Sequence, residues 1–326
     1  MWSKTEGIMK RCLAELFAVL LVSFASLAHG AERPVRIAYP GISIGAMVPA
    51  LAIDKGFFQQ EGLQVEFIVM PTSTGIAALI GEVDYSTTAS SAIGAAVRGL
   101  PIKILMFYVQ RPYHAIVAQK GIKSINDLRG KTISTSGPGG AAYEVPRVII
   151  EHYGMKPDKD VRFIFVGGGN ITERLAQLEA GRFDATVLSP PLLYYAEQKG
   201  FPILATATDL MEYPQQGIAL ASAKLKSNSD QVKQVIRVFL RTLRLIREQR
   251  EETVSFMRRW LKIDEPVAAK SYEMVQRTFS WDGEVSSKAL EKLVEIGKQQ
   301  GRITKETPVS EIVDFRLLRE VRTGAP

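Results

Sequence analysis

Apolar and polar positions follow a pattern that occurs twice along the chain, over residues 65–88 and again over residues 161–187. In each copy a strand-like apolar stretch precedes a polar turn, a helix-like apolar run, a Gly-x-x-Asp segment and another strand-like stretch. The aspartates of the two copies are Asp84 and Asp184. Strand, helix and strand in this order form a βαβ half-unit. The repeat predicts two similar lobes facing a shared cleft, although any two βαβ units share this pattern.

The same periodicities predict further elements on both sides of the repeat. Strands alternate with helices up to residue 222, which favours mainly parallel α/β sheets. Helical spacing dominates afterwards, so we expect a C-terminal helical block packed around the first lobe. The expected strands lie at 35–39, 65–69, 102–109, 161–166 and 203–207, and the expected helices at 46–55, 76–80, 91–98, 141–153, 192–199, 251–261, 266–278 and 286–300.

The first 30 residues have the pattern of a signal peptide. Lys4, Lys10 and Arg11 precede an apolar run over 16–27, and small residues follow up to Gly30. A run of this length is too short to span a bilayer comfortably. We expect export and cleavage near Gly30.

With the leader removed, three segments remain. We assign residues 31–114 together with 215–326 to lobe 1, which includes the C-terminal helices. Residues 115–214 form lobe 2. The fold class is therefore α/β, with two lobes, a hinge and an interlobe ligand cleft.

Cysteine usage and charge exclude several functional classes. The one cysteine of the sequence is Cys12, inside the expected leader. The mature protein would lack the thiols needed for disulfides, zinc–cysteine sites or a cysteine nucleophile. The formal net charge of +7 favours either an anionic ligand or an anionic membrane surface. Basic blocks interleaved with aromatic residues are missing, so we do not expect nucleic-acid binding.

Candidate ligand-binding residues lie in polar turns and at the ends of strands. Backbone N–H groups at helix N-termini attract anions, and glycine lets a ligand approach closely. Each turn could equally serve only as a helix cap. The candidates from turns and strand ends are Ser73, Thr74, Ser136, Gly139, Asn170, Ser90 and Ser189.

Tyrosines and one arginine add to this set. Tyr39 ends the first strand, and Tyr143 and Tyr194 lie in helices of lobe 2. Each could line the cleft or simply pack. Arg111 follows the strand at 102–109 and could pair with a carboxylate or sulfonate, or remain a solvated surface residue.

No catalytic or metal site is expected. Residues 41–45 spell Gly-x-Ser-x-Gly, but a hydrolase elbow needs an oxyanion loop from an earlier strand. We therefore expect Ser43 to line the cleft. His114 and His152 lack a third ligand at useful spacing, so no metal is predicted. No cofactor is predicted either. The residues Lys233, Arg237, Arg241, Arg244 and Arg247 form a basic stripe, either a solvated helix face or a docking surface for a transporter.

Three segments resemble a known family. Residues 52–65 are similar to the GFF-x-x-EGL-x-V segment of periplasmic solute-binding proteins of the nitrate, sulfonate and taurine type. This group includes binders that resemble thiamine-pyrimidine synthases. Residues 81–84 and 125–133 match two further marks. The resemblance implies a type II periplasmic-binding-protein fold, and it implies that the exported protein is periplasmic. It also implies a small-molecule ligand and an ABC-transporter permease as partners, with membrane contact only through the permease. We expect a monomer without enzymatic activity.

Two alternatives stay open on the same fold. Thiamine-pyrimidine synthases are enzymes, but in that family they are intracellular and use a cysteine-rich motif with pyridoxal phosphate. A ligand-sensing module is the other alternative. The identity of the ligand is not evident from the sequence.

Overall fold

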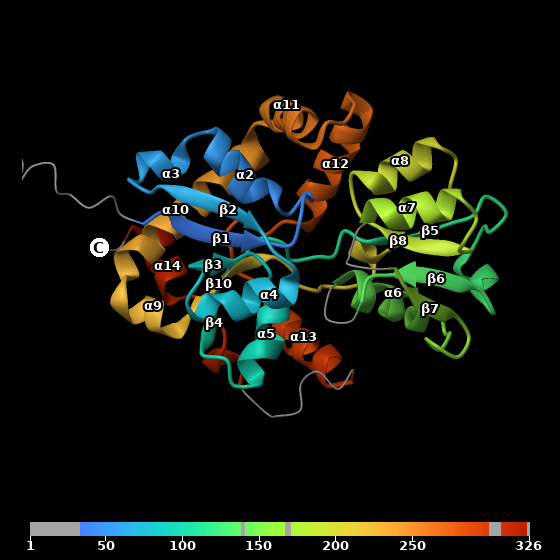
Figure 1. Ribbon diagram of the computed structural model, residues 1–326, viewed down its shortest axis with the longest axis horizontal. Coiled ribbons are helices and arrows are strands. Elements are labelled where there is room, and N and C mark those ends of the chain that lie inside the picture. The colour runs from blue at the N-terminus through green and yellow to red at the C-terminus, as the bar shows by residue number, and fades with distance from the viewer. Residues whose placement is uncertain (1–32, 138–140, 167–170, 300–307, 325–326) are drawn as a thin grey trace, which may run out of the picture. The chain divides into compact units, whose positions relative to one another are not determined.

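The computed structural model describes residues 33–137, 141–166, 171–299 and 308–324, so the predicted signal peptide lies outside the described residues. Residues 35–326 form one compact unit that contains two five-stranded sheets (Figure 1). In spatial order, the first sheet contains β2 (Val65–Val69), β1 (Val35–Tyr39), β3 (Tyr85–Ser86), β10 (Gly217–Ala221) and β4 (Ile102–Phe107). The second contains β7 (Arg162–Phe165), β6 (Thr132–Thr135), β8 (Ala185–Leu188), β5 (Ala115–Ala118) and β9 (Ile203–Thr206).

Each sheet is mainly parallel, as predicted, but it also contains one reversed strand that the sequence pattern did not predict. Strand β1 is parallel to β2 and β3, and β6 is parallel to β7 and β8. Strand β10 is antiparallel to both of its neighbours, and so is β5. The chain reaches β5 from the first sheet and β10 from the second. Each of these two strands therefore starts at the edge of its sheet where the parallel strands end. We call the first sheet with its helices lobe 1 and the second lobe 2.

Helices cover both faces of each sheet, as expected for buried parallel strands. In lobe 1 they are α2 (Met47–Asp54), α3 (Phe57–Gln60), α4 (Thr72–Ala77) with η1 (Ala78–Ile80), and α5 (Ala89–Val97). In lobe 2 they are η2 (Ile125–Leu128), α6 (Ala141–His152), α7 (Ile171–Glu179) and α8 (Leu192–Gln198), followed by η4 (Ala207–Asp209). Helix α4 begins four residues earlier than predicted, because residues 72–75 form its first turn instead of a loop before it.

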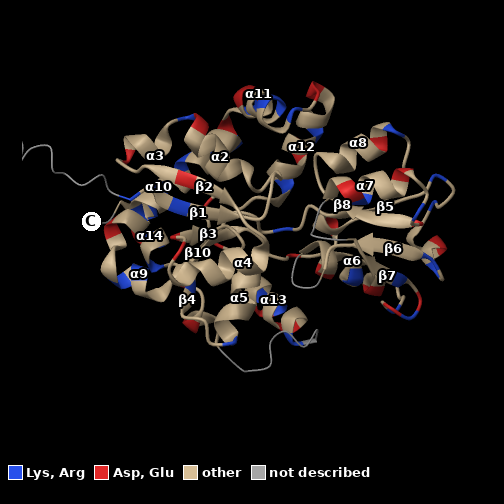
Figure 2. Cartoon of the chain, in the orientation of Figure 1, with Lys and Arg blue, Asp and Glu red and all other residues tan. Residues whose placement is uncertain are grey.

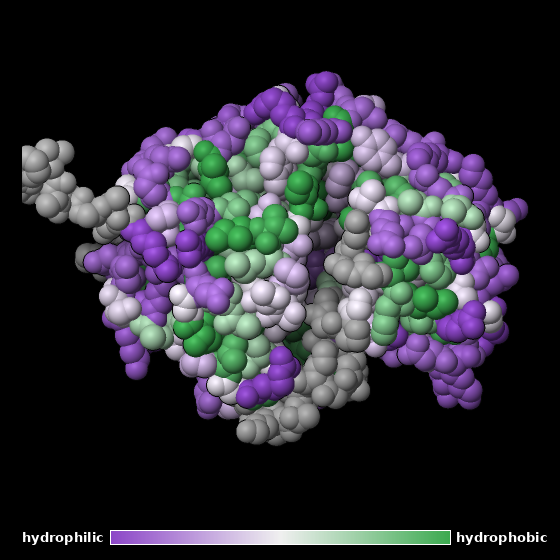
Figure 3. Space-filling model, viewed as in Figure 1, coloured by the Kyte–Doolittle hydropathy of each residue, from purple (hydrophilic) through white to green (hydrophobic). Residues whose placement is uncertain are grey.

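The C-terminal helical block packs on lobe 1, as predicted. Its members are α9 (Ser222–Ser227), α10 (Ser229–Glu248), α11 (Arg250–Leu261), α12 (Glu265–Thr278), α13 (Ser287–Gln299), η5 (Val309–Glu311) and α14 (Arg316–Thr323). Helix α10 places an apolar face, including Val235, Phe239 and Leu243, in the lobe 1 core beside α2. Figure 2 shows that the strands carry few charges, whereas charged residues concentrate on helices and turns. In Figure 3, apolar patches on this face are small and separated by hydrophilic residues.

The aspartate of each repeat joins two parallel strands by a hydrogen bond, β3 to β1 in lobe 1 and β8 to β6 in lobe 2. Asp84 precedes β3, and its carboxylate accepts a hydrogen bond from the backbone N–H of Arg36 in β1 at 2.8 Å. Asp184 precedes β8, and its carboxylate accepts from the backbone N–H of Thr132 in β6 at 2.9 Å. The carboxylate of Asp84 also pairs with Lys224 at 2.8 Å, with side chains only 14% and 17% exposed. The repeat in the sequence thus marks a structural tie.

Replacing Asp84 with alanine should lower the free energy of unfolding by about 3 kcal/mol, because it leaves the largely buried Lys224 ammonium without its partner. Chemical denaturation followed by circular dichroism measures this loss. The control is Glu179→Ala, which removes a more exposed pair with Lys199 and should cost less than about 1 kcal/mol. Equal losses for the two variants would contradict the structural role of Asp84.

Candidate ligand-binding site

Two segments connect the lobes and run antiparallel to each other, residues 108–114 and residues 207–216. The backbone N–H of Val109 donates to the carbonyl of Gln216 at 3.1 Å, and the N–H of Gln215 donates to the carbonyl of Val109 at 2.9 Å. At the lobe 2 end, the N–H of Ala207 donates to the carbonyl of His114 at 3.0 Å. We call this pair the crossing segments.

A cavity of about 480 Å³ opens beside the crossing segments and is lined from both lobes. Lobe 1 contributes residues at the ends of β1 and β3 and at the starts of α4 and α5: Pro40, Gly41, Ile42, Ser43, Thr72, Thr88, Ser90 and Ser91. Lobe 2 contributes Ala141, Ala142, Ile171, Thr172, Arg174 and Ser189, and the crossing segments contribute Tyr113, His114, Gln215 and Gln216. Carboxyl ends of strands and the starts of helices thus meet here, the usual place for a ligand in α/β proteins. We call this cavity the cleft.

A hydrogen-bonded polar group forms one wall of the cleft. The hydroxyl of Tyr113 donates to Oε1 of Gln216 at 3.1 Å, and Oγ of Ser43 accepts from the N–H of Ala46 at 3.2 Å. Burial raises the pKa of Tyr113 to about 12, so its phenol is neutral at physiological pH. Gly45 leaves room for Gln216, because a Cβ atom at Gly45 would lie 1.3 Å from Oε1 of Gln216. The wall therefore presents neutral hydrogen-bonding groups.

His114 is buried next to this wall. Its Nδ1 lies 3.3 Å from Nε2 of Gln215, and its ring stacks on Tyr113 with centroids 5.1 Å apart. Burial, together with the charge of Arg174, lowers the pKa of His114 to about 3. The imidazole therefore stays neutral above that pH, and it supplies a hydrogen-bonding partner instead of a charge.

Three of the predicted site residues line the cleft: Ser43, Ser90 and Ser189. Two others, Gly139 and Asn170, lie outside the described residues. Ser73 and Thr74 fall within α4 and Ser136 bonds the carbonyl of Gly137. None of these last three is among the described residues that line the cleft.

The predicted aromatic residues and Arg111 make other contacts instead. Tyr39 stacks on Phe67 with centroids 3.7 Å apart, and Tyr143 lies against Phe165 and the Arg147 guanidinium. Tyr194 packs against the lobe 1 core beneath Lys270. Arg111 already donates to the carbonyl of Thr208 at 3.2 Å and pairs with Glu212 at 3.4 Å. Each of these four side chains, Tyr39, Tyr143, Tyr194 and Arg111, contacts a residue of another element, and local sequence patterns do not reveal such contacts.

Sequence reasoning missed most of the polar lining. Tyr113, His114, Gln215 and Gln216 lie in the crossing segments, whose pairing joins residues about a hundred positions apart. For Arg174 the sequence did contain a sign. Residues Ile171, Arg174, Leu175 and Leu178 recur at helical spacing, so the arginine occupies a position on an apolar helix face.

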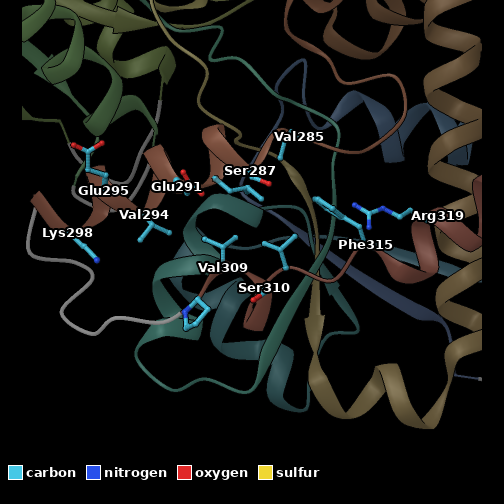
Figure 4. A pocket seen from close by; sticks show the side chains of 13 residues that line it. Val285, Ser287, Glu291, Val294, Glu295, Lys298, Val309, Ser310, Phe315 and Arg319 are labelled. Atoms are coloured by element: carbon cyan, nitrogen blue, oxygen red, sulfur yellow. The ribbon is translucent and has the colours of Figure 1, made fainter.

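Another cavity, of about 640 Å³, lies among α13, η5 and α14 (Figure 4). Its lining mixes apolar side chains such as Val294 and Phe315 with Glu291 and Arg319, and all of it belongs to the C-terminal half of the chain. Neither copy of the repeat contributes to it, so we do not take it as the candidate site.

Two further features are missing from the described residues, which are 33–137, 141–166, 171–299 and 308–324. No group of three or more histidine, cysteine, aspartate or glutamate side chains is arranged to hold a metal ion within those ranges. Among the helices that the structure describes, none combines the length and apolar character required to span a membrane.

Solved structures with the same fold include periplasmic binding proteins. The alkanesulfonate-binding protein SsuA from Xanthomonas axonopodis pv. citri, bound to MOPS, superposes with a TM-score of 0.72 at 15% identity, covering 86% of this chain and 98% of that one. The nitrate-binding protein NrtA from Synechocystis PCC 6803 gives 0.72 at 14% identity, covering 89% and 88%. The protein therefore has the periplasmic-binding-protein fold, as the sequence predicted.

Sequence relatives include binding proteins and enzymes. A protein of Brucella abortus (strain 2308), named as a binding protein, is 26% identical over 264 residues, which cover 78% of this chain and 80% of the relative. A 4-amino-5-hydroxymethyl-2-methylpyrimidine phosphate synthase of Saccharomyces cerevisiae is 28% identical over 114 residues, 33% of each chain. The family described as NMT1/THI5 like matches residues 47–253, well over half of the chain. The protein belongs to the NMT1/THI5-like family.

Proposed function

We propose that the protein is an exported solute-binding protein that captures a small, anionic or oxygen-rich organic molecule in the cleft and delivers it to an ABC importer. The cleft between the two lobes carries this proposal. Residues that follow β1, β3 and β8 and residues that begin α4, α5 and α7 all line it. Both copies of the sequence repeat thus contribute to one cavity, and the crossing segments close its third side.

The chemistry of the lining suits capture rather than catalysis. Ser90, Ser189 and Gln216 offer neutral hydrogen-bonding groups, and Ile42 and Ile171 offer apolar surface. Ser43, the one residue in a hydrolase-like motif, caps the turn before α2 through its bond with Ala46. A ligand held by several weak polar contacts from two lobes can be released when the lobes separate. Release to a membrane permease is the step that an importer requires.

The competing function is an enzyme of the thiamine-pyrimidine type, favoured by the 28% identity to the yeast synthase over a third of the chain. A cysteine-rich motif is expected in that family, and the one cysteine here is Cys12 within the predicted leader. The solute-binding proposal therefore has the stronger support. It includes a periplasmic location and a monomeric state, with lobe limits at 31–114 with 215–326 and at 115–214.

Ligand capture predicts a thermal shift. We expect one chemical class among alkyl and aromatic sulfonates, small carboxylates, nitrate and aminopyrimidines to stabilise the purified protein. A ligand present at 100 times its Kd adds about 2.7 kcal/mol to the free energy of unfolding, a clear rise in Tm. Mass spectrometry of the purified protein detects any compound that remains bound. No shift across the panel and no bound compound would contradict the proposal. Formation of an aminopyrimidine phosphate by the purified protein would favour the enzyme.

Gly45→Ala should weaken binding of the panel compound without unfolding the protein. The new Cβ displaces the terminal amide of Gln216, a flexible group, and breaks its bond with Tyr113. Losing one hydrogen-bonding partner lowers affinity by about tenfold. Isothermal titration calorimetry measures the change. Gly121→Ala is the matched control, because its Cβ would meet no atom within 4 Å. Unchanged affinity in a folded Gly45→Ala protein would remove Gln216 from the site.

Affinity for a ligand of constant charge should vary by less than about twofold between pH 5 and pH 8. The low pKa of His114, about 3, keeps the imidazole neutral throughout this range. Calorimetric titrations at several pH values check this prediction. An affinity that rises tenfold per pH unit on acidification would show that ligand binding is coupled to protonation of a group in the cleft.

A further inference from the structure

Arg174 is a buried cation in the wall of the cleft. It lies in the first half of α7, is only 2% exposed, and lines the cleft beside residues of lobe 1 and the crossing segments. Its Nε donates to the backbone carbonyl of Val187, in β8, at 3.2 Å. This bond fixes the guanidinium against the second sheet and holds it at the cleft.

The guanidinium of Arg174 is incompletely satisfied. Its Nη1 is buried and has no hydrogen-bond partner among the described residues. Arg147, the other largely buried arginine of lobe 2, provides the contrast. Its Nη2 pairs with Asp158 at 3.2 Å, and its guanidinium lies 3.8 Å from the Tyr143 ring centre and 4.2 Å from that of Phe163. The same lobe thus pairs one buried arginine with a carboxylate, whereas Nη1 of the other, a residue that lines the cleft, has no hydrogen-bond partner among the described residues.

An open guanidinium in this position is costly for the unliganded protein. Burial lowers the pKa of Arg174 to about 10, which still leaves it charged at neutral pH. A buried charge without a counter-charge destabilises a protein by several kcal/mol. Such a group is retained where a bound anion can complete it.

The rest of the lining neither neutralises this charge nor adds to it. Among the described residues that line the cleft, the remaining side chains are apolar, hydroxyl, amide or imidazole groups. His114 is neutral above pH 3. The apolar part includes Ile42, 59% exposed, together with Ile171 and the two alanines that begin α6. The cleft therefore combines one positive charge with hydrogen-bonding groups and an apolar surface.

We propose that the ligand is an organic monoanion whose carboxylate or sulfonate pairs with Arg174 while its apolar body lies against Ile42 and Ile171. The inference rests on the proposed function and names the class of its ligand. A guanidinium binds either oxyanion through two parallel hydrogen bonds. A dianion would place its second charge where the described lining offers no counter-charge, and a neutral amide would leave Arg174 unpaired.

Binding of matched probes tests the pairing directly. Calorimetry compares hexanoate and hexane-1-sulfonate with hexanamide, of equal chain length, and with adipate, a dianion. We expect the two monoanions to bind at least about tenfold more tightly than hexanamide or adipate. Arg174→Met should reduce monoanion affinity by about 10- to 100-fold. Arg174→Lys, which keeps the charge, should lose less. Arg182→Gln removes one positive charge from an exposed site in the same lobe and should leave affinity unchanged.

A second measurement needs no ligand. Arg174→Met removes a buried charge that has no counter-charge among the described residues lining the cleft, so the ligand-free variant should melt about 2 °C or more above the wild type, whereas Arg182→Gln should not. The binding and melting measurements together distinguish failure of the monoanion inference from failure of the solute-binding proposal. Equal binding of hexanamide and hexanoate, or full monoanion binding by Arg174→Met, would overturn the monoanion inference and leave solute capture standing. If no probe binds, a Tm of Arg174→Met above the wild type supports an open anion site. A lower Tm would overturn it.

Discussion

The antiparallel pairing of the two crossing segments is the constraint on which the rest of the site depends. Residues 108–114 and 207–216 bond to each other along the backbone, and the C-terminal end of α12 joins them, since the N–H of Gln110 donates to the carbonyl of Thr278 at 2.9 Å. Between the crossing segments, the Tyr113 hydroxyl bonds to the Gln216 side chain and the His114 ring bonds to the Gln215 side chain. These four side chains are therefore fixed relative to one another before any ligand enters.

The same connection explains why both sheets have one strand order. In lobe 1 the spatial order is β2, β1, β3, β10 and β4, and in lobe 2 it is β7, β6, β8, β5 and β9. The strand that follows a crossing segment, β10 or β5, takes the fourth place in its sheet and is reversed. The other four strands of each sheet follow the same order along the chain. A reversed strand can enter only at the edge where the parallel strands end. The carboxyl ends of β1, β3 and β8 must then lie near the crossing segments, and residues that follow them line the cleft. The aspartate ties at Asp84 and Asp184 hold the third strands in that register.

The elements of the fold could be predicted largely from the sequence, and the site only in part. Period and capping patterns located β1, β2, α6 and α8 to within a residue or two, because local spacing determines them. Strand direction could not be predicted, since β5 and β10 are reversed by the path between lobes. Of the predicted residues, Ser43, Ser90 and Ser189 line the cleft. Arg111 does not, because its partners Thr208 and Glu212 come from a distant segment.

Arg174 shows how a departure from local rules can indicate function. Position 174 lies on the buried face of α7, where the local pattern favours an apolar residue. A charged side chain on that face lowers the stability of the protein. The helix nevertheless keeps the guanidinium, and Val187 orients it with one bond while Nη1 has no hydrogen-bond partner in the described part of the chain. We expect an arginine retained only for packing to have its hydrogen-bond donors satisfied. Arg147 is closer to that state, because its guanidinium pairs with Asp158. The incomplete bonding at Arg174 is therefore better explained by a ligand that arrives from the cleft than by the needs of the fold.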